Sequence, residues 1–367
     1  MTEPCHNDII TLVDVWYELK YDEDGNRYLV ATMPKKIREI IETYERHIGK
    51  EAKIYAVPGT AGLCTEKWTE DAIEHTMYRK IVGKIMFCVV KIFPEGANVA
   101  RELARHFSCP GPQQWEELAK FAGYLKGIEP EIKLTYRKPK ELRALSYVDS
   151  NYATDKEHRK SVSGGIHTVG GTIINWMSKT QASVTLSSTE AEYLSLASGA
   201  TQVKFVQQLL QEIADCKTPG IILEDNTGAI FLVKNQQVGS RAKHINVRHH
   251  YIRQMRERGE VDVMFVRSER NSSDILTKNV PEKLLVAHAK DIRNGNLKCR
   301  DEWEELIGNI ETKDESIHHV NWEDVELWIT QQMDDDRRSS CQSMSVMSSW
   351  RIETVLTSMR KDWNFAM

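Results

Sequence analysis

The chain has 367 residues, 41% of them hydrophobic, and a formal net charge of −4. This length allows two or three domains with hydrophobic cores. The negative charge excludes a protein that is basic throughout, so any contact with nucleic acid would need a local basic patch. No apolar run approaches the roughly 18 residues that span a bilayer, so we expect no membrane partner. Seven scattered cysteines without a CxxC pair predict reduced thiols in an intracellular protein.

The first part of the chain, residues 1–135, is predicted to be an α+β domain. Alternating segments at 13–20 and 27–33 flank the turn-forming sequence Asp22-Glu-Asp-Gly-Asn26, which is typical of a β-hairpin. Helical periodicity follows at 35–47, 70–93 and 115–126.

From residue 142 the pattern changes to short strands followed by alternating helices and strands. We expect strands at 143–149, 165–169, 172–177, 220–225 and 261–266, helices at about 187–213, 226–234 and 246–258, and a last helix that opens near Ser273. This order predicts an α/β (α+β) domain, residues 142–283, in which helices flank a mixed five-stranded sheet.

The remaining residues, 284–367, differ in composition. Residues 301–336 carry thirteen acidic side chains and one lysine, interleaved with Trp303, Trp322 and Trp328, and residues 339–349 are low in complexity. We expect a solvated, weakly ordered acidic extension, with docking of a partner as the alternative.

Four carboxylates of the middle region stand at strand ends and helix starts, where such a sheet would gather them. They are Asp149, Glu192, Asp225 and Asp274. Carboxylates that met there would repel one another unless a cation lay among them, and an all-oxygen set suits Mg²⁺ or Mn²⁺. Such sites hydrolyse phosphodiesters with two metal ions. The alternative is that each acid only favours a helix start.

The stretch Ser187-Ser-Thr-Glu190 distinguishes two neighbouring glutamates. It has the form of a capping box, in which the serine hydroxyl and the glutamate satisfy free amides at a helix start. Glu190 therefore has a structural explanation. Glu192 lies on another face of the helix, and it is the residue that we expect to bind metal.

Seven short motifs follow one another between residues 142 and 283. They are Tyr147-Val-Asp-Ser-Asn-Tyr-Ala153, Arg159-Lys-Ser-Val-Ser-Gly164, Asn175-Trp-Met-Ser-Lys179, Leu186-Ser-Ser-Thr-Glu-Ala-Glu-Tyr193, Glu224-Asp-Asn-Thr-Gly-Ala-Ile230, Lys243-His-Ile-Asn-Val-Arg248 and Ser273-Asp-Ile-Leu-Thr-Lys278. In this order they resemble the ribonuclease H domain of copia-type (Pseudoviridae-like) retrotransposon polyproteins.

This resemblance implies a ribonuclease H-like fold and a nuclease that cuts the RNA strand of RNA–DNA hybrids. It implies Mg²⁺ or Mn²⁺, two ions, and no small-molecule cofactor. The resemblance also implies catalytic and metal-binding roles for four residues: Asp149, Glu192, Asp225 and Asp274. Two departures are visible: Asn151 stands where the family usually has a second aspartate, and the loop 267–273 lacks the histidine that helps product leave cellular ribonucleases H. We expect slower turnover from the second departure.

The upstream region resembles the end of the copia-type reverse transcriptase. Tyr78-Arg-Lys-Ile-Val-Gly-Lys84 and the segment 115–127 look like its thumb-side helices and the link to the nuclease, and Val57-Pro-Gly-Thr60 looks like the segment before them. No Tyr-x-Asp-Asp pair occurs, so we expect no DNA synthesis by this chain. The resemblances predict a fragment whose partner is the rest of the retroelement polyprotein, in a cytoplasmic particle or the nucleus.

A basic stretch runs from residue 241 to 258. Its candidate nucleic-acid ligands are Arg241, Lys243, Arg248 and Arg253, which could follow the backbone of a hybrid. A solvated helix face explains the stretch equally well. Trp176 and Tyr193 could stack on bases, but their amphipathic surroundings favour the core.

Two alternatives to an active ribonuclease H remain. The first is a catalytically inactive or domesticated relic that folds and binds nucleic acid without cleaving it. The second is a transposase or integrase, which shares the fold and the acidic chemistry, although the motifs favour the nuclease.

Overall fold

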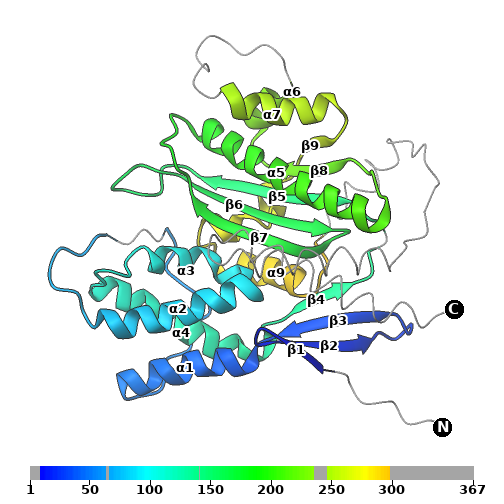
Figure 1. Cartoon of the computed structure of the whole chain (residues 1–367). Helices are drawn as coiled ribbons and strands as arrows, with labels where there is room; N and C mark the ends of the chain where they lie inside the picture. The colour runs from blue at the N-terminus through cyan, green and yellow to red at the C-terminus, as the bar shows by residue number, and fades with distance from the viewer. Residues whose placement is uncertain (1–8, 63–65, 140, 235–245, 298–367) are drawn as a thin grey trace, which may run out of the picture.

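The computed structural model describes residues 9–62, 66–139, 141–234 and 246–297, which form two β-sheets and the helices around them (Figure 1). The N-terminal region contains β1 (Ile9–Leu12), β2 (Val15–Tyr21), β3 (Arg27–Thr32), α1 (Pro34–Ile48), α2 (His75–Lys91), η1 (Pro94–Gly96), α3 (Ala97–Ala104), α4 (Pro112–Ile128), η2 (Glu129–Glu131) and β4 (Leu134–Arg137). The rest contains β5 (Ala144–Asn151), β6 (Val162–Val169), β7 (Thr172–Thr180), α5 (Ser188–Ala214), β8 (Gly220–Glu224), α6 (Thr227–Lys234), α7 (Asn246–Glu257), β9 (Val261–Phe265), η4 (Ser268–Arg270), α8 (Asp274–Thr277) and α9 (Glu282–Arg293).

The smaller sheet has the order β1-β2-β3-β4, and all its pairs are antiparallel. The predicted hairpin is confirmed as β2–β3. Its turn is closed by Asp22, whose Oδ1 accepts the amide of Asn26 at 2.8 Å, and by Gly25, whose φ of 79° lies in the left-handed region that favours glycine. The sequence pattern did not indicate β1 or β4, since each is only four residues long.

The larger sheet has the order β7-β6-β5-β8-β9. Strand β6 is antiparallel to both its neighbours, whereas β5, β8 and β9 are parallel to one another. This mixed five-stranded sheet with helices on its faces has the ribonuclease H-like fold that the sequence predicted.

Different helices cover the two faces of the larger sheet (Figure 1). On one face, Val148 and Ile222 pack with Tyr193 of α5 in a core that α6 and α7 complete. On the other face, Tyr147 and Trp176 belong to a second core that continues into the N-terminal region. The indole of Trp176 donates to the carbonyl oxygen of Val89 in α2 at 3.1 Å. The expected core positions of Trp176 and Tyr193 are therefore confirmed.

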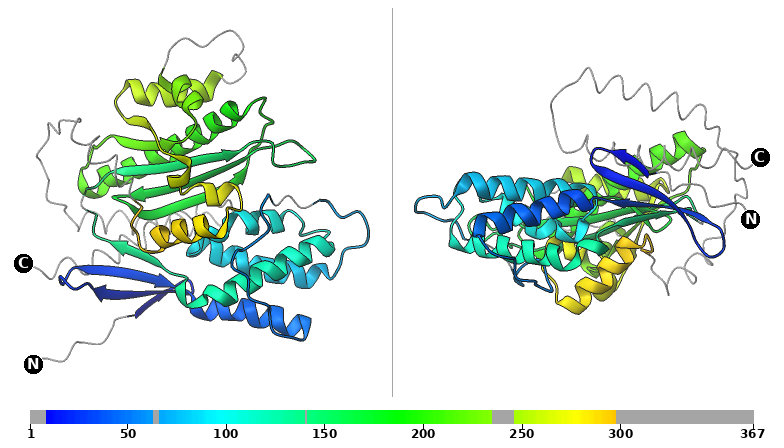
Figure 2. Two further views of the ribbon diagram at one scale, coloured as in Figure 1. Left: turned by 180° about the vertical axis from the view of Figure 1, so that it is seen from behind. Right: turned by 90° about the horizontal axis from the view of Figure 1, so that it is seen from below.

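Helix α9 extends past residue 283, where the sequence placed the end of the second domain. It lies below the larger sheet and beside the N-terminal helices (Figure 2). Its last residue, Arg293, is buried, and its guanidinium lies 2.8 Å from the carboxylates of both Glu95 and Glu131. Residues 298–367, with the tryptophans of the expected acidic extension, lie outside the described residues.

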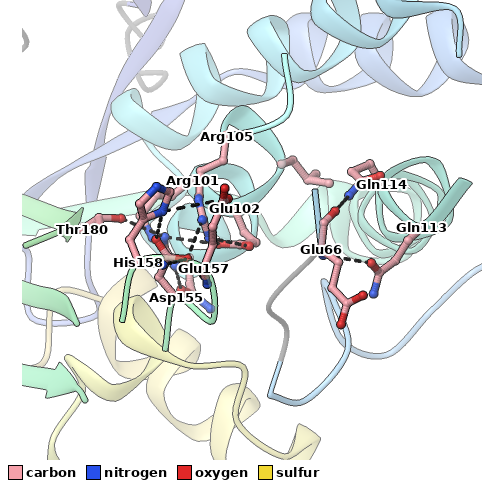
Figure 3. A network of polar contacts seen from close by, with 12 residues as sticks. Glu66, Arg101, Glu102, Arg105, Gln113, Gln114, Asp155, Glu157, His158 and Thr180 are labelled. Carbon is pink, nitrogen blue, oxygen red and sulfur yellow. Dashed lines mark hydrogen bonds and ion pairs between the residues drawn. The ribbon is translucent and has the colours of Figure 1, made fainter. Parts of the chain in front are cut away.

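A polar cluster joins α3 to the β5–β6 hairpin (Figure 3). Arg105 approaches Asp155 of the hairpin loop at 3.0 Å. Arg101 donates to the hydroxyls of Ser178 and Thr180 in β7, at 3.2 and 3.3 Å. Glu102, almost fully buried, pairs with both arginines and fixes their direction. The N-terminal region thus contacts the larger sheet through charges as well as through the shared apolar core.

Some element boundaries differ from the sequence expectation. Helix α2 begins at His75 and not at residue 70, because the amide of Ile73 donates to the carbonyl of Pro110 and holds the preceding segment against the start of α4. Among the helices of the described residues, none has the length and apolarity required to cross a bilayer.

Candidate active site

Asp149 lies near the end of β5, opposite Gly164 of β6. Side chains alternate along a strand. Val148 therefore faces α5, and Asp149 faces α8, where Thr277 donates its hydroxyl hydrogen to Oδ2 of Asp149. The Asp149 side chain is almost completely buried, with 2% of its surface exposed.

Gly164 permits the close approach of α8 to this strand. A Cβ atom at this position would lie 2.6 Å from Cγ2 of Thr277 and 3.0 Å from the carbonyl oxygen of Ser273. Both distances are shorter than ordinary van der Waals contact, so a larger residue would push α8 away from Asp149.

Asp274 is the first residue of α8 and is buried. The ammonium of Lys278, one turn later, lies 3.0 Å from its Oδ1. The preceding loop is tied to β5 by Asn271, whose side-chain amide donates to the carbonyl of Val148 at 2.8 Å. This bond explains how a four-residue helix can hold its carboxylate at the strand.

Glu192 is positioned by the start of α5. Ser187 accepts the amide of Glu190 at 3.1 Å, as a capping serine should. The carboxylate of Glu190 accepts from the amide of Leu186 at 2.7 Å, one residue earlier than the capping box requires. Glu190 is thus occupied at the helix start. Glu192 turns into the protein, is 7% exposed, and has an oxygen, Oε2, without a hydrogen-bond partner among the described residues.

Asp225 follows the end of β8, and Ser268 donates to its Oδ2 at 2.6 Å. One oxygen each of Asp149, Asp225 and Asp274 lie within 4.8 Å of one another. A second group with the same spacing joins Asp225 to Glu192 and Glu224. The structure therefore brings the four predicted carboxylates together, adds Glu224, and makes Asp225 common to both groups.

Burial and mutual repulsion change the proton affinity of these acids. Burial, reinforced by the carboxylate of Asp274, raises the pKa of Asp149 to about 8. Burial and the carboxylates of Asp149 and Asp225 raise the pKa of Glu192 to about 9. Burial also raises the pKa of Asp274, although Lys278 opposes this shift. Such a cluster is expected to lose its protons more readily when a divalent cation enters it.

These pKa values predict that the metal-free protein loses stability as the pH rises. A carboxyl group whose pKa is higher in the folded than in the unfolded protein stabilises the fold below its unfolded pKa, and this stabilisation is lost as the pH rises through the folded pKa. For Asp149 the interval runs from 3.8 to about 8, and for Glu192 from 4.5 to about 9. Each unit of difference is worth about 1.4 kcal/mol.

Thermal melts in EDTA between about pH 5 and pH 9 measure this dependence, and we expect a fall in Tm of at least about 3 °C. Mg²⁺ should raise Tm more at the alkaline end. The Asp149→Asn variant is the matched control, because it lacks one of the groups with a raised pKa and should show a flatter dependence. A Tm that is constant or rises over this interval would contradict the prediction.

The four basic residues predicted to bind nucleic acid do not lie together among the described residues. Arg241 and Lys243 lie outside the described residues, and Arg248 is placed only by the backbone of α7. Arg253 is half-buried, and its Nε donates to the carbonyl of Leu232 near the end of α6 at 2.9 Å. The guanidinium of Arg253 therefore joins α7 to α6.

A groove of about 640 Å³ lies on the α5 side of the sheet. Its lining includes Ser163, Lys179, Thr180, Leu194, Ser198 and Tyr251. Ser163 pairs with Ser150, the residue after Asp149, whereas Leu194, two residues after Glu192, lies on another face of α5.

The sequence reasoning missed three residues that contact or join the cluster: Glu224, Thr277 and Lys278. All three lie within the motifs quoted above, so their closeness in sequence to Asp225 or Asp274 could have indicated them. Helical spacing indicates Lys278, since residues four apart on a helix are neighbours. Glu224 and Asp225 are adjacent, and adjacent strand residues normally point to opposite faces. Only the end of β8 at Glu224 lets both approach Glu192.

No protein-family model matches the chain. Over 266 residues it is 30% identical to the retrovirus-related Pol polyprotein from transposon TNT 1-94 of Nicotiana tabacum, covering 71% of this chain and 20% of that protein. Over 204 residues it is 33% identical to the retrovirus-related Pol polyprotein from transposon RE1 of Arabidopsis thaliana, covering 55% of this chain and 14% of that protein. Similar solved structures include the N-terminal RNase H domain of Rv2228c from Mycobacterium tuberculosis, fused to maltose-binding protein. The identity is 13% and the TM-score 0.29, and the match covers 41% of this chain and 98% of that one.

Proposed function

Since this chain belongs to the Pol polyproteins of copia-type retrotransposons, of which it spans a fifth or less, we propose that it is a metal-dependent ribonuclease H. Its reaction would be endonucleolytic hydrolysis of the RNA strand of RNA–DNA hybrids. The observation that carries the proposal is the gathering of Asp149, Glu192, Asp225 and Asp274 at the carboxyl ends of two parallel strands. Open α/β sheets commonly bind ligands at these strand ends.

The donor atoms fit Mg²⁺ or Mn²⁺. They are all carboxylate oxygens, which hard divalent cations prefer over nitrogen or sulfur. The buried Oε2 of Glu192 has no partner within the described part of the chain, and a cation would satisfy it. Asp149, Asp225 and Asp274 would hold one ion, and Glu192 with Asp225 the other. When bound, the ions supply an activated water and stabilisation of the leaving 3′ oxygen.

The protein's own contribution is to hold these carboxylates in place. Thr277 fixes the orientation of Asp149 through its hydroxyl, and Asn271 ties the loop before Asp274 to β5. Lys278 offsets part of the negative charge beside Asp274. A carboxylate held by such contacts does not have to reorganise when the substrate binds.

The substrate backbone requires positive charge that the net charge of −4 does not supply. We propose that Arg241, Lys243 and Arg248 contact phosphates of the hybrid, and that one strand passes along the groove beside α5. The N-terminal region would be the end of a reverse transcriptase, and polymerase chemistry would come from another part of the polyprotein. The proposal places the chain inside the cell, with retroelement RNA and its DNA copy.

A cleavage assay on a hybrid with labelled RNA tests the proposal. The full chain with Mg²⁺ or Mn²⁺ should release short RNA products, and EDTA should abolish the reaction. Single-stranded RNA and duplex DNA should remain intact. The background is set by a double variant, Asp149→Asn with Asp225→Asn. Binding of the hybrid without cleavage above this background would instead support an inactive relic, and cleavage of duplex DNA would support a transposase or integrase.

A further inference from the structure

The carboxylate of Glu224 lies in the site, although strand alternation in the sequence would not place it beside Asp225. It is the last residue of β8, and its side chain is completely buried, with 0% of its surface exposed. Alternation along β8 places it on the same face as Ile222, which packs in the core beneath α5. This is also the face from which Glu192 reaches the site.

The hydrogen bonds of Glu224 are incomplete. Its Oε1 accepts the amide of Asn226 at 2.9 Å. Its Oε2 is buried and has no hydrogen-bond partner in the part of the chain that the structure describes, which is also true of Oε2 of Glu192. A buried carboxylate oxygen without a partner is costly, so native proteins normally satisfy it with a donor, a water or an ion.

Two such oxygens beside Asp225 indicate what the missing partner is. Oxygens of Glu192, Glu224 and Asp225 lie within 4.8 Å of one another. In an octahedral Mg²⁺ site, oxygens about 2.1 Å from the ion are about 3.0 Å apart when adjacent and about 4.2 Å apart when opposite, so the three oxygens would have to move closer together to bind one cation. A divalent cation can bind oxygens of all three carboxylates and compensate their charge once they ionise, which a neutral hydrogen-bond donor cannot do.

We propose that Glu224 is a fifth metal-binding carboxylate, which completes the second cation position together with Glu192 and Asp225. The ligand is a small divalent cation of the Mg²⁺ or Mn²⁺ type. Asp225 then bridges this position and the one formed with Asp149 and Asp274. The inference rests on the metal requirement of the proposed function and extends it to a residue that the family resemblance does not assign.

The charge of the cluster supports this assignment. Five carboxylates surround the two positions, and Lys278 is the one basic side chain of the described residues that forms an ion pair with them. Lys278 contacts Asp274, which belongs to the other group. The position of Glu192 and Glu224 therefore has the greater need for a cation, and three carboxylates should bind it more tightly than two.

Calorimetric titration of the full chain with MnCl₂ tests the proposal directly. The wild-type protein should bind two ions. In Glu224→Gln, which keeps the shape and removes the charge, the affinity for one of the two ions should fall by at least about tenfold, the effect that loss of an outer-shell partner already has. The matched control is Glu190→Gln on α5, whose carboxylate caps the helix and should leave both affinities unchanged.

A thermal melt with and without MnCl₂ separates a metal ligand from a structural acid. As a ligand, Glu224→Gln should retain the Tm of the metal-free protein and show a smaller rise of Tm with Mn²⁺. A purely structural role predicts a lower Tm without metal and an unchanged rise, and this result would overturn the proposal. Two ions bound by Glu224→Gln with wild-type affinity would also overturn it.

The same titration distinguishes failure of this inference from failure of the proposed function. If the wild-type protein cleaves the hybrid and Glu224→Gln binds Mn²⁺ normally, Glu224 is not a ligand although the ribonuclease assignment stands. If Glu224→Gln loses an ion but the wild-type protein does not cleave, Glu224 is a ligand in a site that does not hydrolyse RNA. A wild-type protein that binds no Mn²⁺ would overturn both.

Discussion

Asp149→Asn should lower the rate of hybrid cleavage by at least about a thousandfold without unfolding the protein. Metal ions supply several kcal/mol of transition-state stabilisation, and each 1.4 kcal/mol or so is worth a factor of ten in rate. The amide keeps the shape of the side chain and can still accept from Thr277. Because burial raises the pKa of Asp149, removal of its charge should not destabilise the metal-free fold. Single-turnover rates with enzyme in excess measure the effect, and Tm provides the check of folding.

Variants of Glu190 and Glu192, two residues apart on α5, test whether the loss of cleavage is specific to the site. Glu192→Gln should lose cleavage to a similar extent, since Glu192 is buried beside Asp225. Glu190→Gln should retain cleavage within a factor of about three and lose a few tenths to about 1 kcal/mol of stability, because its carboxylate caps the helix. Equal rates for the two variants, whether both fast or both slow, would contradict the assignment of Glu192 to the metal.

A chain that begins at Leu142 should fail to fold into a cooperative structure, although it contains every predicted motif of the nuclease. Tyr147 and Trp176 would lose the N-terminal residues that cover them. Burial of a large apolar side chain is worth about 1.5–3 kcal/mol, and the net stability of a domain is only about 5–15 kcal/mol. Loss of several such contacts, together with the indole bond to Val89, is enough to unfold it.

Thermal melts and dye binding to exposed apolar surface measure this effect. The comparison is between residues 142–297 and residues 9–297, which differ only in the N-terminal region. The shorter chain should bind the dye and show no sharp transition, whereas the longer one should melt cooperatively. Addition of a separately produced 9–141 fragment should restore part of the transition. Cooperative melting and hybrid cleavage by the shorter chain alone would contradict the prediction.

Much of the fold follows from local patterns in the sequence. The turn sequence at Asp22 specifies the β2–β3 hairpin, and the alternation of strands and helices after residue 142 specifies the mixed sheet. The apolar period of α5 explains why Tyr193 is buried. These features depend on residues a few positions apart, which a reader of the sequence can count.

The rest depends on residues far apart in the chain. Strand β4 is four residues long and is defined by its pairing with β3, about a hundred residues earlier. The contact between Arg105 and Asp155 and the burial of Glu95 against Arg293 leave no periodic signal. In the site, the positions of Asp149 and Glu192 could be predicted from element ends. The approach of Glu224 could not, because it depends on where β8 ends relative to α5.

Gly164 shows that the spacing of the carboxylate cluster depends on a position without a side chain. It has no side chain, yet it sets how near α8 can come to β6 and to Asp149 on the neighbouring strand. A larger residue at this position would displace α8 without altering any of the carboxylates. When related sequences are compared for activity, the residue opposite Asp149 should be examined together with the carboxylates.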